Sequence, residues 1–264
     1  AAIVLSETHV DVSCNGGSDG SIDLSIASGG VSPFSYAWSN GATTQDISGL
    51  SAGTYNVTVT DDNGCEASAS VTITEPDAIA ISGVVTDVLC NGASTGAIDI
   101  TVSGGSGSGY TFAWSNSETT EDITGLSAGD YTVTVTDGSC TASMTFTVTQ
   151  PTAIALSLSG TDPTCNGYND GIVSVVATGG TPTYTYLWDD AGGSTTATVG
   201  NLPAGTYNVT VTDANSCVQT GSVTITDPAA IVLSETHVDV SCNGGSKGSI
   251  DLTVADGVAP YTYL

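Results

Sequence analysis

Apolar and polar residues alternate with a period of two through the first quarter of the chain, and no stretch shows helical periodicity. Such alternation is typical of β-strands that are buried on one face. Clusters of Gly, Asn, Asp and Ser separate the alternating segments, as expected of turns. The expected strands are residues 3–12, 21–27, 34–39, 44–47, 54–60 and 66–74. Six or seven short strands at this spacing predict an all-β fold in which two sheets pack face to face.

The same pattern occurs four times along the 264 residues. Each copy contains Cys-Asn-Gly, which begins at Cys14, Cys90, Cys165 and Cys242. The spacings (90 − 14 = 76, 165 − 90 = 75 and 242 − 165 = 77) are those of small independent domains, too long for the coils of a solenoid. The predicted domains are residues 1–76, 77–151 and 152–228, followed by a truncated fourth copy, 229–264.

Two kinds of aromatic position refine the fold prediction. A Tyr lies two residues after a Gly at the start of one strand in each complete copy (Tyr55, Tyr131 and Tyr207). This is the tyrosine-corner arrangement of immunoglobulin-like sandwiches, and Trp38, Trp114 and Trp188 then take the place of the central core Trp. By alternation, Phe34 and Tyr36 share a face with Trp38. A core stripe is favoured over an exposed sugar-binding platform, because each domain has few other large residues. The prediction is a tandem array of immunoglobulin-like β-sandwich domains.

The chain is strongly acidic, with a formal net charge of −26 from 27 acidic residues against one basic residue, Lys247. Nucleic acid and anionic lipid surfaces are thereby excluded as partners, since both are bound through clustered cations. No long apolar segment is present, so we expect no direct membrane insertion in this segment. We expect the chain to be a segment of a longer protein.

The seven cysteines follow the repeat. A second Cys lies 50 to 52 residues after the first in each complete copy, which predicts the pairs Cys14–Cys65, Cys90–Cys140 and Cys165–Cys217. Cys242 is expected to be unpaired through truncation of the fourth copy. Domains of this size are marginal on core burial alone, so such a bond would contribute much of their stability. Disulfides indicate an oxidising, extracellular setting. Buried free thiols are the alternative.

One topological question stays open. If six strands simply reverse direction in turn, both cysteines of a copy lie at the same end of the sandwich, which suits the predicted bond. Both chain termini then also lie at one end, which suits a linear array poorly. A seventh strand, or a first strand that switches sheets, would resolve the conflict.

The chain resembles the SprB repeat family of large cell-surface adhesins from gliding Bacteroidetes. The resemblance covers all four copies and rests on residues 14–24, 33–41, 50–61 and 71–76 and their counterparts. Copy three departs from it at Ser174 and Thr198, where the other complete copies have Asp. The resemblance implies an extracellular filament, secreted by the type IX route, that adheres to surfaces and is driven along the cell in gliding.

Recurring aspartates suggest a calcium hypothesis. Asp11, Asp87, Asp162 and Asp239 precede the first Cys by three residues, and Asp61, Asp137 and Asp213 precede the second by three or four. If each copy closes its own disulfide, these carboxylates lie together, and Asp62 could add a ligand of the kind calcium prefers. The alternative is that Asp61 starts a β-turn through its side chain, as Asp often does. No other cofactor is expected.

Catalysis has no support in the sequence. His9 and His237 occupy the same position in copies one and four, and the other copies have no His there. We therefore expect a non-enzymatic stalk of a bacterial cell-surface adhesin or filament, whose partners are external surfaces or polysaccharide and its own neighbouring repeats. The alternative is an array of glycan-binding modules that use loops such as residues 104–110, which differ in length from residues 29–34.

Overall fold

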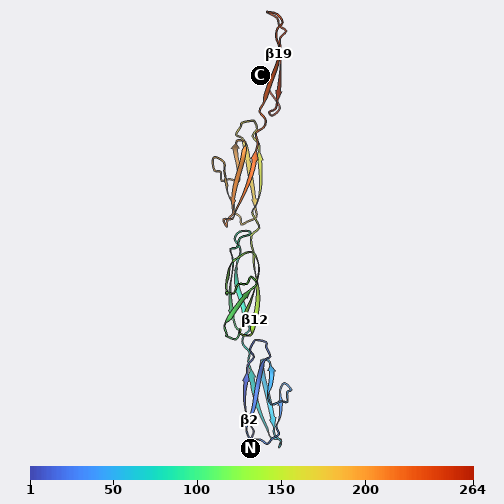
Figure 1. Cartoon of the computed structure of the whole chain (residues 1–264), viewed down its shortest axis with the longest axis vertical. Helices are drawn as coiled ribbons and strands as arrows, with labels where there is room; N and C mark the ends of the chain where they lie inside the picture. The colour runs from blue at the N-terminus through green and yellow to red at the C-terminus, as the bar shows by residue number, and fades with distance from the viewer. The chain divides into compact units, whose positions relative to one another are not determined.

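The computed structural model describes residues 1–264, and all of its regular structure is β-strand (Figure 1). No helix in the chain has the length and apolar character needed to cross a bilayer. The chain divides into two compact units. The first comprises residues 1–87 and 94–149, and the second comprises residues 88–93 and 150–264.

The first unit holds two sandwiches of six strands each. The strands of the first sandwich are β1 (Val4–Val10), β2 (Gly20–Ser28), β3 (Ser35–Trp38), β4 (Ile47–Leu50), β5 (Gly53–Thr60) and β6 (Glu66–Ile73). Those of the second are β7 (Ala80–Thr86), β8 (Gly96–Ser103), β9 (Tyr110–Trp114), β10 (Ile123–Leu126), β11 (Gly129–Asp137) and β12 (Cys140–Val148).

The second unit holds a third sandwich and a two-stranded sheet from the fourth copy. The sandwich consists of β13 (Ala155–Thr161), β14 (Gly171–Thr178), β15 (Thr185–Trp188), β16 (Thr198–Leu202), β17 (Gly205–Thr212) and β18 (Val218–Ile225). The fourth copy contributes β19 (Val232–Val238) and β20 (Ser249–Ala255). Each complete copy therefore has six strands, which answers the question of strand number.

Each sandwich packs two three-stranded antiparallel sheets against each other. In the first, the orders are β1-β2-β4 and β3-β5-β6, and the other two sandwiches repeat this arrangement. Its core lies between the sheets, with Leu24 from one and Val59 from the other fully buried. The prediction of tandem immunoglobulin-like sandwiches is confirmed.

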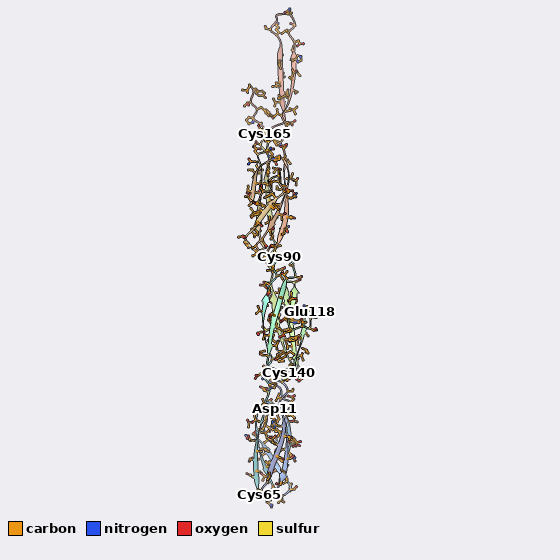
Figure 2. All side chains as sticks on the ribbon, turned by 90° about the vertical axis from the view of Figure 1, so that its left-hand side faces the viewer. Asp11, Cys65, Cys90, Glu118, Cys140 and Cys165 are labelled. Atoms are coloured by element: carbon orange, nitrogen blue, oxygen red, sulfur yellow. A yellow bond between two sulfur atoms is a disulfide. The ribbon has the colours of Figure 1, made fainter.

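The direction of the fourth strand resolves the topological conflict. β3 pairs antiparallel with β5, and β4 pairs antiparallel with β2 in the other sheet. The chain passes from the end of β2 to the start of β3, so β3 runs opposite to β2. Because β4 is also antiparallel to β2, β3 and β4 run in the same direction in different sheets. The chain therefore does not simply reverse between them. β5 therefore runs back toward the chain's entry point, and Cys65 lies at the opposite end of the sandwich from Asp11 (Figure 2). Cys14 follows Asp11 by three residues, in the turn between β1 and β2. The expectation that both cysteines of a copy lie at one end is wrong.

The fourth strand also begins later than predicted. Residues 44–46 form a loop in place of the start of the expected strand, and the strand begins at Ile47. The Thr44 carbonyl accepts the indole N–H of Trp38 at 2.9 Å, and the Asp46 carboxylate accepts the backbone N–H of Leu24 at 3.0 Å. These two hydrogen bonds hold residues 44–46 against the core and leave strand pairing to the residues that follow.

The aromatic positions confirm the predicted core. Trp38, Trp114 and Trp188 are 5%, 4% and 2% exposed. Each tyrosine of the predicted corners donates its hydroxyl to the carbonyl four residues upstream, at 2.7–3.0 Å; the pairs are Tyr55 with Ser51, Tyr131 with Ser127, and Tyr207 with Pro203. The corner fixes where β5, β11 and β17 begin and thus sets their register against the neighbouring strands.

Candidate functional site: the junctions between repeats

Two disulfides join successive repeats to each other. Cys14 bonds to Cys140, with a Cα–Cα distance of 5.4 Å, and Cys90 bonds to Cys217, with a Cα–Cα distance of 5.6 Å. In each pair, the first Cys of one copy meets the second Cys of the next. The predicted pairings Cys14–Cys65, Cys90–Cys140 and Cys165–Cys217 are therefore wrong.

The strand directions explain the observed pairing. Within one sandwich the two cysteines lie at opposite ends, too far apart for a bond that needs Cα atoms within about 7 Å. The first Cys lies instead at the end from which the chain passes to the next copy, where that copy presents its second Cys. Cys65, Cys165 and Cys242 are exposed and free.

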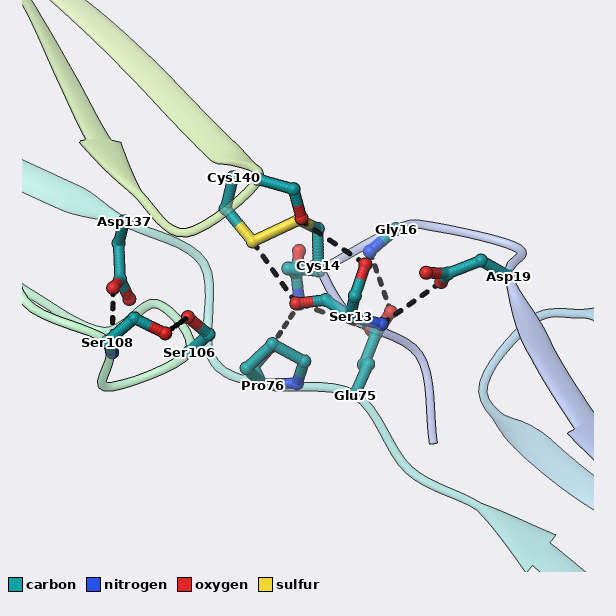
Figure 3. Close-up of a disulfide and its surroundings, with 12 residues drawn as sticks. Ser13, Cys14, Gly16, Asp19, Glu75, Pro76, Ser106, Ser108, Asp137 and Cys140 are labelled. Atoms are coloured by element: carbon teal, nitrogen blue, oxygen red, sulfur yellow. Dashed lines mark hydrogen bonds between the residues drawn. A yellow bond between two sulfur atoms is a disulfide. The ribbon is translucent and has the colours of Figure 1, made fainter. Parts of the chain in front are cut away.

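The Cys-Asn-Gly turn presents the first cysteine. In the first copy, the N–H of Gly17 donates to the Cys14 carbonyl at 2.9 Å, and Gly16 has a φ of 73°, which is costly for residues other than glycine. The N–H of Ser13 donates to the Asp19 carboxylate at 3.0 Å (Figure 3). These contacts hold the turn so that the Cys14 sulfur projects toward Cys140 at the start of β12.

The same turn also holds the linker between copies. The Asn15 side chain donates to the Pro76 carbonyl at 3.1 Å and to the Glu75 carboxylate at 3.2 Å, and the N–H of Gly16 donates to Glu75 at 2.6 Å (Figure 3). We call this set of contacts the linker clasp. Equivalent contacts occur in the second and third copies: Asn91 with Pro151, Gly92 with Gln150, Asn166 with Pro228, and Gly167 with Asp227.

Sequence reasoning missed the linker clasp, although its signal was present. In each of the three complete copies, Cys-Asn-Gly is followed, some 60 residues later, by Glu-Pro, Gln-Pro or Asp-Pro. Each of these residues before proline carries a side-chain oxygen that can accept a hydrogen bond. The recurrence of such an acceptor before proline, beside an invariant Asn-Gly in the same copies, predicts a contact between the two.

The second group of candidate calcium ligands caps turns and loops. The Asp61 carboxylate accepts the N–H groups of Asn63, Cys65 and Val31 at 2.8–3.0 Å. Asp213 makes the corresponding three bonds in the third copy. These N–H groups, that of Cys65 above all, hold the pKa of Asp61 below its usual range. The geometry is that of the turn-forming alternative.

Asp137 has a different role from Asp61 and Asp213, because the turn between this aspartate and the second Cys of its copy is one residue shorter. Asp137 and Cys140 pair directly at the end of a tight hairpin, so this carboxylate is not needed to close the turn. It accepts instead the N–H groups of Gly107 and Ser108 at 2.9 and 2.8 Å (Figure 3). Gly105 lies against the same carboxylate, where a Cβ atom would collide with it. Asp137 thus fixes the loop of residues 104–109 beside the Cys14–Cys140 bond.

The first group of candidates lies elsewhere in each copy. Asp11, Asp87 and Asp162 accept the backbone N–H of Thr74, Thr149 and Thr226, each at 2.7 Å. Asp11 and Asp61 occupy opposite ends of the first sandwich, so the arrangement on which the calcium hypothesis depended does not form within a copy. Asp62 is exposed. Across the chain, no three His, Cys, Asp or Glu side chains gather in a way that could hold a metal ion.

Comparison with solved structures finds tandem immunoglobulin-domain proteins. A Dscam chain from a study of isoform specificity is 13% identical and covers 85% of this chain and 72% of its own, with a TM-score of 0.27. A three-domain titin variant is 12% identical, with coverages of 86% and 98% and a TM-score of 0.36. Domains 3–5 of the Drosophila OTK extracellular region are 11% identical, with coverages of 83% and 91% and a TM-score of 0.29.

No curated protein matches the sequence. The model of the SprB repeat, however, matches it four times, at residues 6–43, 82–119, 157–193 and 234–264. Each match contains the Cys-Asn-Gly turn, and together the matches cover more than half of the chain. The chain therefore belongs to the SprB repeat family.

Proposed function

We propose that this chain is a non-enzymatic stalk within a bacterial cell-surface adhesin, and that it bears load between the cell and an external surface. Membership of the SprB family indicates the repeat region of such an adhesin. The observation that carries the proposal is the covalent junction: the disulfides Cys14–Cys140 and Cys90–Cys217 each join one repeat to the next. A covalent bond between repeats strengthens a connection that is pulled.

The disulfides also support an extracellular location. Bonds of this kind persist in oxidising compartments and on cell surfaces, whereas cytosolic thiols are kept reduced. The acidic charge of −26 fits the same setting, because it keeps neighbouring stalks apart and soluble.

The polar groups at the repeat ends support a structural role over a catalytic one. Asp61 and Asp213 are engaged by backbone N–H groups, as are Asp11 and Asp87. His9 contacts its neighbour Glu7 at 3.0 Å on an exposed strand. A general base needs to reach a nucleophile or a substrate proton, and these side chains hold the turns, linkers and strands of the fold instead.

The finer part of the proposal is that the stalk moves along the cell during gliding. Beads coated with antibody against the repeats should bind living source cells and travel along them. Beads that bind and stay in place would restrict the function to a static adhesin or filament. Failure to bind intact cells, together with binding to lysed cells, would overturn the cell-surface assignment.

A glycan array distinguishes the stalk from a set of lectin modules. If the repeats serve as a stalk, residues 1–228 should give no glycan-dependent signal. A signal that survives in the separately presented copies would identify each copy as a binding module and would contradict the stalk.

A further inference from the structure

The four bonded cysteines alternate along the chain. In sequence order they are Cys14, Cys90, Cys140 and Cys217, and the bonds join the first to the third and the second to the fourth. Each bond spans a sequence separation of 126 or 127 residues. The second loop therefore opens before the first has closed, and the two loops overlap from Cys90 to Cys140.

This overlap has a consequence for every peptide bond between Cys14 and Cys217. Each such bond lies within at least one disulfide-closed loop, and those from Cys90 to Cys140 lie within both. When one bond is cut, the two new chain ends stay joined through a disulfide. The predicted bonds within single copies would have left the linkers outside every loop, so that one cut there would separate the protein.

The disulfide-closed loops enclose a segment that is open to attack. Proteases nick exposed segments by preference. The first linker contains the exposed residues Asp77 and Ala78. It lies within the Cys14–Cys140 loop, so a cut there leaves the two parts joined.

We propose that the junction disulfides give the stalk a second covalent connection, which keeps successive repeats joined after any single cleavage of the backbone between Cys14 and Cys217. The inference deepens the proposed stalk function. Its test measures covalent continuity alone, whereas the bead experiment measures surface exposure and movement, so either can fail without the other.

The unmodified chain offers a direct test, because it contains a single Met, Met144, and a single Lys or Arg, Lys247. Cyanogen bromide cleaves after Met144, within the Cys90–Cys217 loop. Trypsin cleaves after Lys247, beyond Cys217. Both digests of the oxidised protein are analysed by denaturing electrophoresis and mass spectrometry, with and without reductant.

We expect the cyanogen bromide product to migrate as one molecule until it is reduced, and then to give residues 1–144 and 145–264. The tryptic cut should release residues 248–264 without reductant, which shows that denaturation separates fragments not joined by a disulfide. Release of residues 1–144 from the non-reduced, oxidised protein would overturn the proposal.

A second variant examines the first linker. Ala78 is exposed, so Ala78→Met combined with Met144→Leu moves the cyanogen bromide site into the linker without disturbing a core contact. The cleaved variant should stay whole until it is reduced. Addition of Cys14→Ser should release residues 1–78 without reductant. Release from the variant that keeps Cys14, or retention after Cys14→Ser, would each contradict the assigned bond.

Discussion

Replacement of single cysteines separates the observed bonding pattern from a pattern within each repeat. Cys14 is bonded to Cys140 in the next repeat, while Cys65, its former candidate partner, is free and exposed. We therefore expect Cys14→Ser to destabilise the first two sandwiches, and Cys65→Ser, in the same repeat, to leave their stability unchanged.

The size of the effect follows from the loop that the bond closes. In the chain-entropy model, a cross-link across a separation of 126 residues restricts the unfolded chain by about 5 kcal/mol at 25 °C. This figure applies to complete unfolding of both sandwiches, because the loop reaches from the first turn of one to the last hairpin of the other. It is comparable to the whole stability of a small domain.

Urea denaturation of residues 1–151, followed by the fluorescence of Trp38 and Trp114, measures the effect. Both indoles are buried, so unfolding of either sandwich changes the signal. The midpoint for Cys14→Ser should fall well below that of the parent, whereas the midpoint for Cys65→Ser should coincide with it.

Counting thiols in the intact, oxidised chain gives an independent check. The parent should show three free thiols, at Cys65, Cys165 and Cys242. Cys14→Ser should show four, because Cys140 is released, and Cys65→Ser should show two. Bonds within repeats would instead give one thiol in the parent and two in each variant. Equal destabilisation by the two substitutions would refute the assigned connectivity.

Three further outcomes are expected of the third repeat and its turns. Tyr207→Phe removes a hydroxyl that donates to the Pro203 carbonyl at 2.7 Å, so thermal unfolding should show a loss of about 1 kcal/mol, whereas Tyr168→Phe at an exposed site should show none. The N–H of Thr181, first among its donors, holds the pKa of Asp213 below its usual range, so stability should be complete above about pH 4, the unfolded value, and should fall as the pH drops through the lower folded value. An Asp213→Asn variant should lose less over that range, and an equal loss would contradict the role of the carboxylate. Millimolar calcium should produce neither heat nor a shift in melting temperature, because backbone N–H groups already bind the turn carboxylates, and a clear shift would restore the calcium hypothesis.

The local pattern of the sequence predicted the sandwich well. The alternation and the recurrent Trp and Tyr depend on contacts within a strand or over a few residues. Such local contacts are the same whatever the topology of the strands. The direction of a strand cannot be predicted in this way, because the alternation of apolar and polar residues is the same whichever way the strand runs. The reversal expected between β3 and β4 had no support in the pattern, and the predicted end of the sandwich for Cys65 depended on it.

The disulfide pairing shows a limit that is specific to repeats. In a regular array, the sequence separation between Cys14 and Cys65 recurs from copy to copy, but so does the sequence separation between Cys14 and Cys140. Regular spacing therefore cannot decide between a bond within a copy and a bond to the next. The prediction of a calcium site from the aspartates was wrong for a related reason. It assumed that aspartates close in sequence to the two cysteines of a copy would be close in space, and this holds only if those two cysteines are bonded to each other.

The alternating disulfides also set how far the protein can be drawn out. Along the backbone, 217 − 14 = 203 residues separate Cys14 from Cys217, which is roughly 700 Å when fully extended. Through the two disulfides the route is far shorter: it crosses to Cys140, runs backward along the chain to Cys90 through 140 − 90 = 50 residues, and crosses again to Cys217. That route reaches only roughly 180 Å. Under tension the array would therefore reach its maximum extension between Cys14 and Cys217 while most of the backbone between them stayed slack. The segment from Cys140 back to Cys90 would carry the load, and the force would pass through it from its C-terminal to its N-terminal end.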